Sequence, residues 1–515
     1  HPLRMGWYSI KSFVFAALVV YSWACCNAPV AHASVLYTAS LDIPVQNKNP
    51  FGLPMNPLFS GEGSDIYESG LFLFKKGDYP SAISRWSLVL KKYPQSRTGE
   101  AGAFLIGEAY YAYSESKSEV KTDPSRSTDI EKKTRENEWM RALNAFQKEI
   151  QEYPDSNWVP AGLYRMASVY QQLGLLVEAR GTFQRIIGEF PKSPYGSKAV
   201  LGVATSTFLE GKFKDAAAAF QQVLRKYPSS EEVRVAVYGT ADSFFLLREF
   251  GEAQRFYEAG LTKWPGYLKA HPDSLFRYGE AVFQNGDWEN ARAAFFTLFN
   301  LYPSHDHAGI ALNRIGDTYR LDGRAALSRG LYETVISLYP AGDAPLLAKI
   351  ALGELKEEEA QSLEHRPVDQ VTAYEVAIHY FQDVSSAENL LAGEAFLRLG
   401  RMMEHRGASD QALQAYESLL ETEFPAQTDP ILGVSSDHSK EAAVQSASRI
   451  LGEMMQIKIQ QEDDLGLVFL YHRHQKFFLT FFRDIPRLQT IAEAHRFPGA
   501  VWDLAMSLAG HALKG

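Results

Sequence analysis

The sequence predicts an all-α fold in which pairs of helices stack one after another along the chain. The first observation is a recurring dipeptide of an aromatic residue and proline, found as Tyr93-Pro94, Tyr153-Pro154, Phe190-Pro191, Tyr227-Pro228, Trp264-Pro265, Tyr302-Pro303, Tyr339-Pro340 and Phe424-Pro425. From Pro154 to Pro340 these prolines are separated by 37, 37, 37, 38 and 37 residues. A fixed period in this range is the signature of an array of supersecondary units.

The second observation is an apolar stripe before each proline, seen most clearly in residues 211–228. Gly211 is placed to end one helix, because glycine adopts the left-handed cap conformation without strain. Apolar side chains then recur at spacings of three and four, as on one face of a helix, at Phe213, Ala216, Phe220, Leu224 and Tyr227. Pro228 cannot continue the helix and ends it. We expect the small residue to allow close packing of the two helices and the aromatic to fill the gap towards the next unit.

The preceding helices carry the other half of the motif. The residues at the motif positions are Leu163…Ala167…Tyr170 with Gly174, Leu275…Gly279 with Gly286, and Leu312…Gly316…Tyr319 with Gly323. Together the two halves resemble the tetratricopeptide repeat (TPR). The Tyr-Pro-x-Ser sequence that ends the repeats at residues 93–96 and 153–156 is similar to the repeat ending of two exported proteins, the outer-membrane assembly lipoprotein and the TolA-binding cell division coordinator. The resemblance implies a right-handed superhelical solenoid of helix-turn-helix units with a concave groove that holds extended or helical peptide.

We expect four regions along the chain. Residues 1–33 resemble an export signal, with a positive Lys11, an apolar core from Phe13 to Val20, and the small-x-small sequence Ala31-His32-Ala33 before Ser34. Cleavage after Ala33 fits better than lipidation at Cys25, since the residue three positions before Cys25 is not leucine-like. Residues 34–63 form a proline-rich leader, 64–436 the TPR array, and 437–515 degenerate C-terminal helical repeats.

Two stretches depart from the regular pattern. The polar stretch from Ser114 to Arg135 lacks periodicity, so we expect a solvent-exposed loop there. The last residues, Ala512 to Gly515, stop in mid-pattern without a polar capping helix, which suggests a truncated C-terminus.

Composition and motifs argue against catalysis and against nucleic-acid binding. The formal net charge is −9, whereas nucleic-acid binding requires clustered positive charge. No glycine-rich phosphate loop, His-Glu-x-x-His or Gly-x-Ser-x-Gly motif is present. His305-Asp306-His307 and His472-Arg473-His474 each lack a third ligand at a useful spacing, so we expect no metal site and no cofactor.

The candidate site lies on the first helix of each unit, which lines the groove in the TPR family. The position directly after the repeat glycine or alanine is occupied by Ser168, Thr205, Asp242, Glu280, Asp317 and Glu354. Three residues before the same glycine or alanine, the chain carries residues that include Tyr164, Tyr238, Phe276 and Asn313. The carboxylates among them are spaced by one repeat and should stack as an acidic ladder beside exposed aromatics. Such a surface suits a basic, partly apolar peptide; alternatively, the carboxylates form only a solvated face.

The most direct interpretation is a non-catalytic interaction scaffold of the bacterial cell envelope, located in the periplasm, for which association with the outer membrane is a further expectation. Its partner would be an envelope protein or peptide, and no segment after the signal is apolar enough to span a membrane. Two alternatives remain open: a glycan- or peptidoglycan-binding accessory module, with Tyr238 and Phe276 as the sugar platform, or the binding arm of a longer protein.

Overall fold

A computed structural model describes residues 61–118, 129–363, 365–387 and 391–421, together with scattered positions between 450 and 470. The expected signal, the leader up to residue 60 and most of 437–515 lie outside the described residues. Throughout the described ranges the chain is helical and contains no strand. The predicted all-α fold of helix-turn-helix repeats is therefore confirmed.

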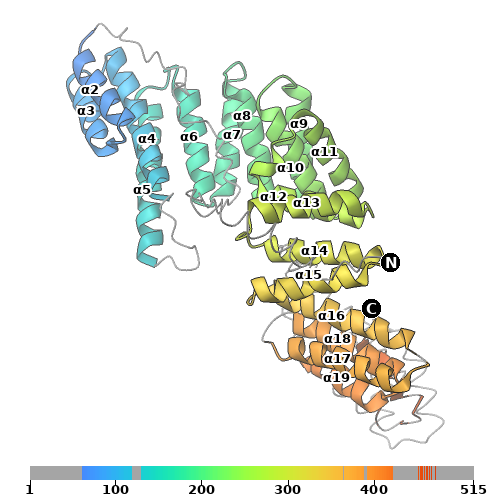
Figure 1. Cartoon of the computed structure of the whole chain (residues 1–515). Helices are drawn as coiled ribbons and strands as arrows, with labels where there is room; N and C mark the ends of the chain where they lie inside the picture. Colours follow the sequence, from blue (N-terminus) through green and yellow to red (C-terminus); the bar gives the residue numbers. More distant parts are fainter. Residues whose placement is uncertain are drawn as a thin grey trace, which may run out of the picture. The chain divides into compact units, whose positions relative to one another are not determined.

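The chain divides into two compact units, residues 1–240 and 241–515, with the boundary inside α10 (Glu232–Leu246). In the first unit the helices are α2 (Ser64–Lys75), α3 (Tyr79–Lys92), α4 (Arg97–Ser118), α5 (Asp129–Glu152), α6 (Val159–Gln172), α7 (Leu176–Glu189), α8 (Gly196–Leu209) and α9 (Phe213–Lys226). Each helix packs against the one that follows it, and the first helices of successive pairs also contact each other, as α2 with α4, α4 with α6, and α6 with α8. Figure 1 labels these helices from blue to green.

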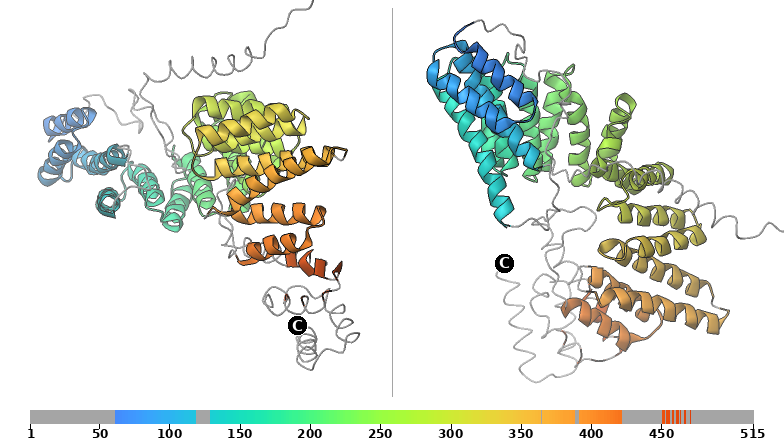
Figure 2. Two further views of the ribbon diagram at one scale, coloured as in Figure 1. Left: turned by 60° about the horizontal axis from the view of Figure 1, so that its bottom comes forward. Right: turned by 60° about the vertical axis from the view of Figure 1, so that its left-hand side comes forward.

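The second unit repeats this arrangement. Its helices after α10 are α11 (Phe250–Lys263), the short η1 (Leu268–Ala270), α12 (Pro272–Gln284), α13 (Trp288–Leu301), α14 (Ala308–Leu321), α15 (Ala325–Leu338), α16 (Asp343–Ser362), α17 (Pro367–Ser385), α18 (Leu391–His405) and α19 (Ser409–Glu421). Here the first helices α14, α16 and α18 contact each other in succession. Figure 2 shows the helix pairs of each unit from two further directions. No helix among the described residues has both the length and the apolar character needed to cross a membrane.

The repeat aromatic forms the core of each pair. Phe146, Phe183, Phe220, Phe295 and Tyr332 are all almost fully buried. Each ring lies against a glycine of a first helix, so closely that a side chain at that glycine would collide with it: a Cβ at Gly316 would lie 2.5 Å from Tyr332, and one at Gly202 would lie 2.5 Å from Phe183. The close contacts are thus made at first-helix glycines and not at the second-helix alanines, such as Ala216, that the prediction named. Phe183 and Phe220 pack on a glycine of the next pair, as expected, whereas Phe146, Phe295 and Tyr332 pack on a glycine of their own pair.

The turns inside the pairs α6–α7, α8–α9, α12–α13 and α14–α15 follow the prediction. Gly174, Gly211, Gly286 and Gly323 have φ between 73° and 82°, the left-handed region that glycine adopts without strain. In the α10–α11 turn the same conformation is adopted by Arg248, with φ of 62°. The expected loop at Ser114–Arg135 is too long, because α4 continues to Ser118 and α5 already begins at Asp129.

Candidate functional site

The candidate residues lie on the first helices, and we call the surface formed by α4, α6 and α8 in the first unit, and by α12, α14, α16 and α18 in the second, the first-helix face. The structure does not leave the carboxylates on this face free. Each one that follows the repeat glycine or alanine pairs with arginine.

Four of these ion pairs in the described repeats share one geometry. The carboxylate directly follows the small residue of one repeat, and the guanidinium belongs to the residue two positions before the small residue of the next repeat. The pairs are Glu108 with Arg165 at 2.8 Å, Asp242 with Arg277 at 3.3 Å, Glu280 with Arg314 at 2.6 Å and Glu354 with Arg398 at 3.0 Å. Ion pairs therefore join consecutive repeats along this face.

The carboxylates of Asp242 and Glu280 are buried, as is that of Glu108. The Asp242 side chain also accepts hydrogen bonds from the Tyr257 hydroxyl and, at 2.8 Å, from the Ser274 hydroxyl. The Glu280 side chain is buried beside the Arg314 guanidinium. Both carboxylates are enclosed by side chains of their own unit, so neither presents a free charge to a ligand.

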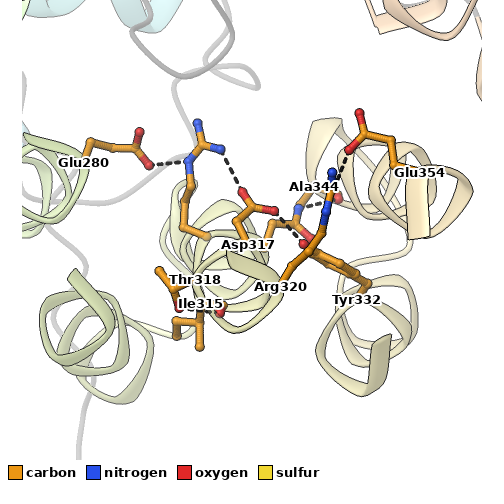
Figure 3. Close-up of polar contacts among 10 residues, drawn as sticks. Glu280, Ile315, Asp317, Thr318, Arg320, Tyr332, Ala344 and Glu354 are labelled. Carbon is orange, nitrogen blue, oxygen red and sulfur yellow. Dashed lines mark hydrogen bonds and ion pairs between the residues drawn. The ribbon is translucent and has the colours of Figure 1, made fainter. Parts of the chain in front are cut away.

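Asp317 and Glu354 are more accessible. The carboxylate of Asp317 is 24% exposed, accepts from Arg314 at 2.9 Å and from the Tyr332 hydroxyl at 2.6 Å, and so shares one arginine with Glu280. Figure 3 shows Glu280 and Asp317 in this network, with Arg320 reaching Glu354 in the next pair. Glu354 is 15% exposed and also pairs with Arg398.

Burial and charge act in opposite directions on these arginines. Burial alone would lower the pKa of Arg314, but the neighbouring Glu280 and Asp317 carboxylates raise it above its ordinary value. In the first unit, burial raises the pKa of Glu108, and the Arg165 guanidinium opposes that shift. In each pair the partner's charge favours the ionised form that burial disfavours.

Where the repeat carries a hydroxyl instead of a carboxylate, the next repeat carries glycine instead of arginine. Ser168 is followed in the next repeat by Gly202, and Thr205 by Gly239. The two hydroxyls bond within their own helices, to the carbonyl oxygens of Tyr164 at 2.9 Å and Leu201 at 3.0 Å. The two positions are therefore matched at these two interfaces as well. Asp317 is the exception, because the next repeat carries Ala351 at the arginine position and Asp317 pairs with Arg314 of its own helix instead.

The expectation of exposed aromatics is wrong. Tyr238 and Phe276 are buried, and the Phe276 ring stacks on His307 with centroids 4.3 Å apart. Tyr164 is partly buried and packs against Phe183 and Tyr195. A sugar-stacking platform needs open ring faces, so the interpretation of Tyr238 and Phe276 as a glycan platform is wrong as well.

Asn313 has a structural contact in the second unit. Its side-chain amide donates to the carbonyl oxygen of Ala344 at 2.8 Å, and the residue is buried. His305 and His307 both approach Asp273, with Nε2 to Oδ1 distances of 3.5 and 3.6 Å. Within the part of the chain that the structure describes, no group of three or more histidine, cysteine, aspartate and glutamate side chains is arranged to hold a metal ion; His472 and His474 lie outside it.

The sequence reasoning missed the arginines, although a signal was present. Arg277 and Arg314 are 37 residues apart, and each lies two positions before a repeat glycine, as does Arg398. Reading this position together with the carboxylate position of the preceding repeat would have indicated paired charges.

Comparison with protein families agrees with this geometry. Tetratricopeptide repeat models match residues 161–193, 210–267, 238–299 and 373–428. The chain therefore contains tetratricopeptide repeats in both compact units, and these repeats are a fold used for protein–protein interaction. No curated protein sequence matches the chain.

Solved structures with some likeness include other tetratricopeptide repeat proteins. One from Parabacteroides merdae is 15% identical with a TM-score of 0.36, and the match covers 56% of this chain and 97% of that one. YrrB, described as a TPR protein with an unusual peptide-binding site, is 16% identical with a TM-score of 0.34, covering 40% of this chain and 98% of that one. MamA from Desulfovibrio magneticus RS-1 is 16% identical with a TM-score of 0.30, covering 36% and 97%. At these TM-scores the likeness does not define a shared arrangement of the repeats.

Proposed function

We propose that this protein is an exported, non-catalytic scaffold of the bacterial cell envelope that binds a partner protein or peptide on its first-helix face. The observation that carries the proposal is the set of ion pairs joining consecutive first helices, of which Glu280 with Arg314 is one example. They fix the side chains of this face before a partner arrives, so docking loses less conformational entropy.

The accessible part of this face in the second unit lies on α14, α16 and α18. Arg320 pairs with Glu354 and, at 3.0 Å, with Glu358, while Arg398 pairs with Glu354 and, at 2.8 Å, with Glu394. Both signs of charge are therefore offered side by side. This favours a peptide that carries both signs over the purely basic partner that a free acidic ladder would select.

The proposals of export and of a periplasmic location rest on residues 1–33 alone. These residues have a positively charged beginning, an apolar core and a small-x-small cleavage sequence. Association with the outer membrane is proposed on the resemblance of the repeats to envelope assembly proteins. Fractionation of cells that express the full chain tests this part. A protein found only in the cytoplasm, with residues 1–33 retained, would contradict it.

Capture of the partner tests the binding face. The full chain is crosslinked in envelope fractions and compared with the double variant Glu358→Lys and Glu394→Lys, which reverses two exposed charges on the first-helix face. The matched control is Glu252→Lys with Glu258→Lys, two exposed glutamates on the second helix α11. We expect a partner that wild type and control both capture and that the first-helix variant loses; equal capture by all three would contradict the proposed face.

A further inference from the structure

Glu149 is a carboxylic acid at a position that other repeats reserve for the apolar core. It lies on α5, five residues before the proline of its aromatic-proline dipeptide. In several other repeats the corresponding residues are Val89, Ile186, Val223, Leu298 and Val335, all fully buried, and in α11 it is the buried Gly260. Glu149 is just as enclosed, with 1% of its surface exposed.

The structure makes room for this carboxyl group but gives it no hydrogen-bond donor. A Cβ at Gly162 on α6 would lie 2.5 Å from the Glu149 Oε2 atom, so only glycine fits opposite it. In several other repeats the corresponding residue is alanine, as at Ala199, Ala236, Ala311 and Ala348, while α4 has Gly102 and α12 has Ser274. Among the residues that the structure describes, neither oxygen of Glu149 has a hydrogen-bond partner.

An unpartnered carboxyl group in such a site is stable only when it is neutral. Burial, followed by the nearby Glu100 carboxylate on α4, raises the pKa of Glu149 from its ordinary value to about 8. Gly162, which faces it from α6, carries no charge. Ionisation would leave a buried negative charge without compensation, and hydration of the carboxylate requires that α5 and α6 separate.

We propose that Glu149 makes the packing of α5 on α6 sensitive to pH: the interface stays closed while the carboxyl group is protonated and opens to water as the group ionises. A carboxyl exposed by opening titrates near about pH 4.3, its ordinary value. Between that pH and the folded-state value, each pH unit therefore raises the opening equilibrium by up to about tenfold. Below pH 4.3 both states are protonated and the effect is absent.

Hydrogen exchange on the full chain tests the proposal. Peptides from α5 and α6 are followed from pH 5 to pH 9 in wild type and in Glu149→Gln, which keeps the shape and removes the ionisation. After correction for intrinsic exchange rates, we expect protection in wild type to fall by up to about tenfold per pH unit up to the folded-state pKa of about 8 and to level off above it. It should stay nearly constant in the variant, and peptides from α7 and α8, where Ile186 holds this position, serve as the internal control.

A second measurement keeps the result decisive if the variant folds poorly. Infrared difference spectra of wild type against Glu149→Ile should show a protonated carboxyl band at pH 7 that disappears in the variant. An identical pH dependence of exchange in wild type and Glu149→Gln would overturn the proposal, and so would the absence of the protonated carboxyl band.

Discussion

Replacing Glu108 and Arg165 measures how much their ion pair contributes to the free energy that holds consecutive repeats together. Two hydrogen bonds join these side chains, from Arg165 Nε to Oε1 at 2.8 Å and from Arg165 Nη2 to Oε2 at 3.2 Å. The side chains are only 5% and 14% exposed, and the guanidinium also lies 4.3 Å from the ring centroid of Tyr111.

Arg165→Leu leaves the Glu108 carboxylate enclosed without its partner. Breaking a buried pair in this way costs about 3–5 kcal/mol in the free energy of unfolding. Glu108→Leu leaves the guanidinium unpaired and should also destabilise, by somewhat less because Arg165 keeps its contact with Tyr111.

The double replacement recreates a combination that the chain already uses. At the preceding interface the same two positions are Leu71 and Leu105, which belong to one apolar cluster. We expect the double variant to lie within about 1 kcal/mol of wild type, because an apolar pair of similar volume commonly replaces a buried ion pair without loss. The double-mutant cycle should therefore give a coupling of at least about 2 kcal/mol.

The assay is urea denaturation of the full chain, combined with hydrogen exchange of peptides from α4 and α6 so that the loss is located. Single variants that each cost less than about 1 kcal/mol, or a double variant whose cost equals the sum of the two, would refute the conclusion that the pair acts as one buried unit.

Four further replacements test the packing of the repeats. Gly202→Ala places a Cβ 2.5 Å from the Phe183 ring and should cost about 1–3 kcal/mol, whereas Gly330→Ala, where nothing lies within 4 Å, should stabilise by up to about 1 kcal/mol; thermal unfolding compares the two. Phe183→Ala removes a buried wedge and should cost about 3–5 kcal/mol, measured by the urea midpoint, and a loss below 1 kcal/mol would contradict its place in the core. Arg248→Gly relieves a left-handed backbone and should raise stability by up to about 1 kcal/mol, with an unchanged or lower melting temperature as the contrary result.

The repeat architecture was readable from the sequence because each unit repeats the same local chemistry. A glycine that takes positive φ, an aromatic that packs on a glycine and a proline that ends a helix all act within or next to one helix pair, so their spacing is visible along the chain. The exceptions follow the same logic. Arg248 adopts the left-handed conformation that glycine has in the other turns, although it is not a glycine. Helix α4 extends to Ser118 although its end lacks a regular apolar pattern.

The character of the candidate site could not be predicted in the same way. Asp242 and Glu280 were expected to face a ligand, but each meets an arginine 34 or 35 residues later, and the pairing depends on how consecutive first helices stack. Tyr238 and Phe276 occupy positions that line the groove in tetratricopeptide repeats, yet in this structure both side chains are buried and offer no open ring face. Whether the accessible residues, such as Glu354, bind a partner stays a prediction.

Site-specific photocrosslinking in the envelope is the most direct test of the proposed scaffold. A photoreactive residue is placed at Glu358 on the first-helix face and, in a separate variant, at Glu252 on a second helix. The proposal predicts a defined crosslinked protein from position 358 and none of that protein from position 252. Crosslinks to the same protein from both positions, or none from position 358 when the unsubstituted protein is captured by a general crosslinker, would contradict it.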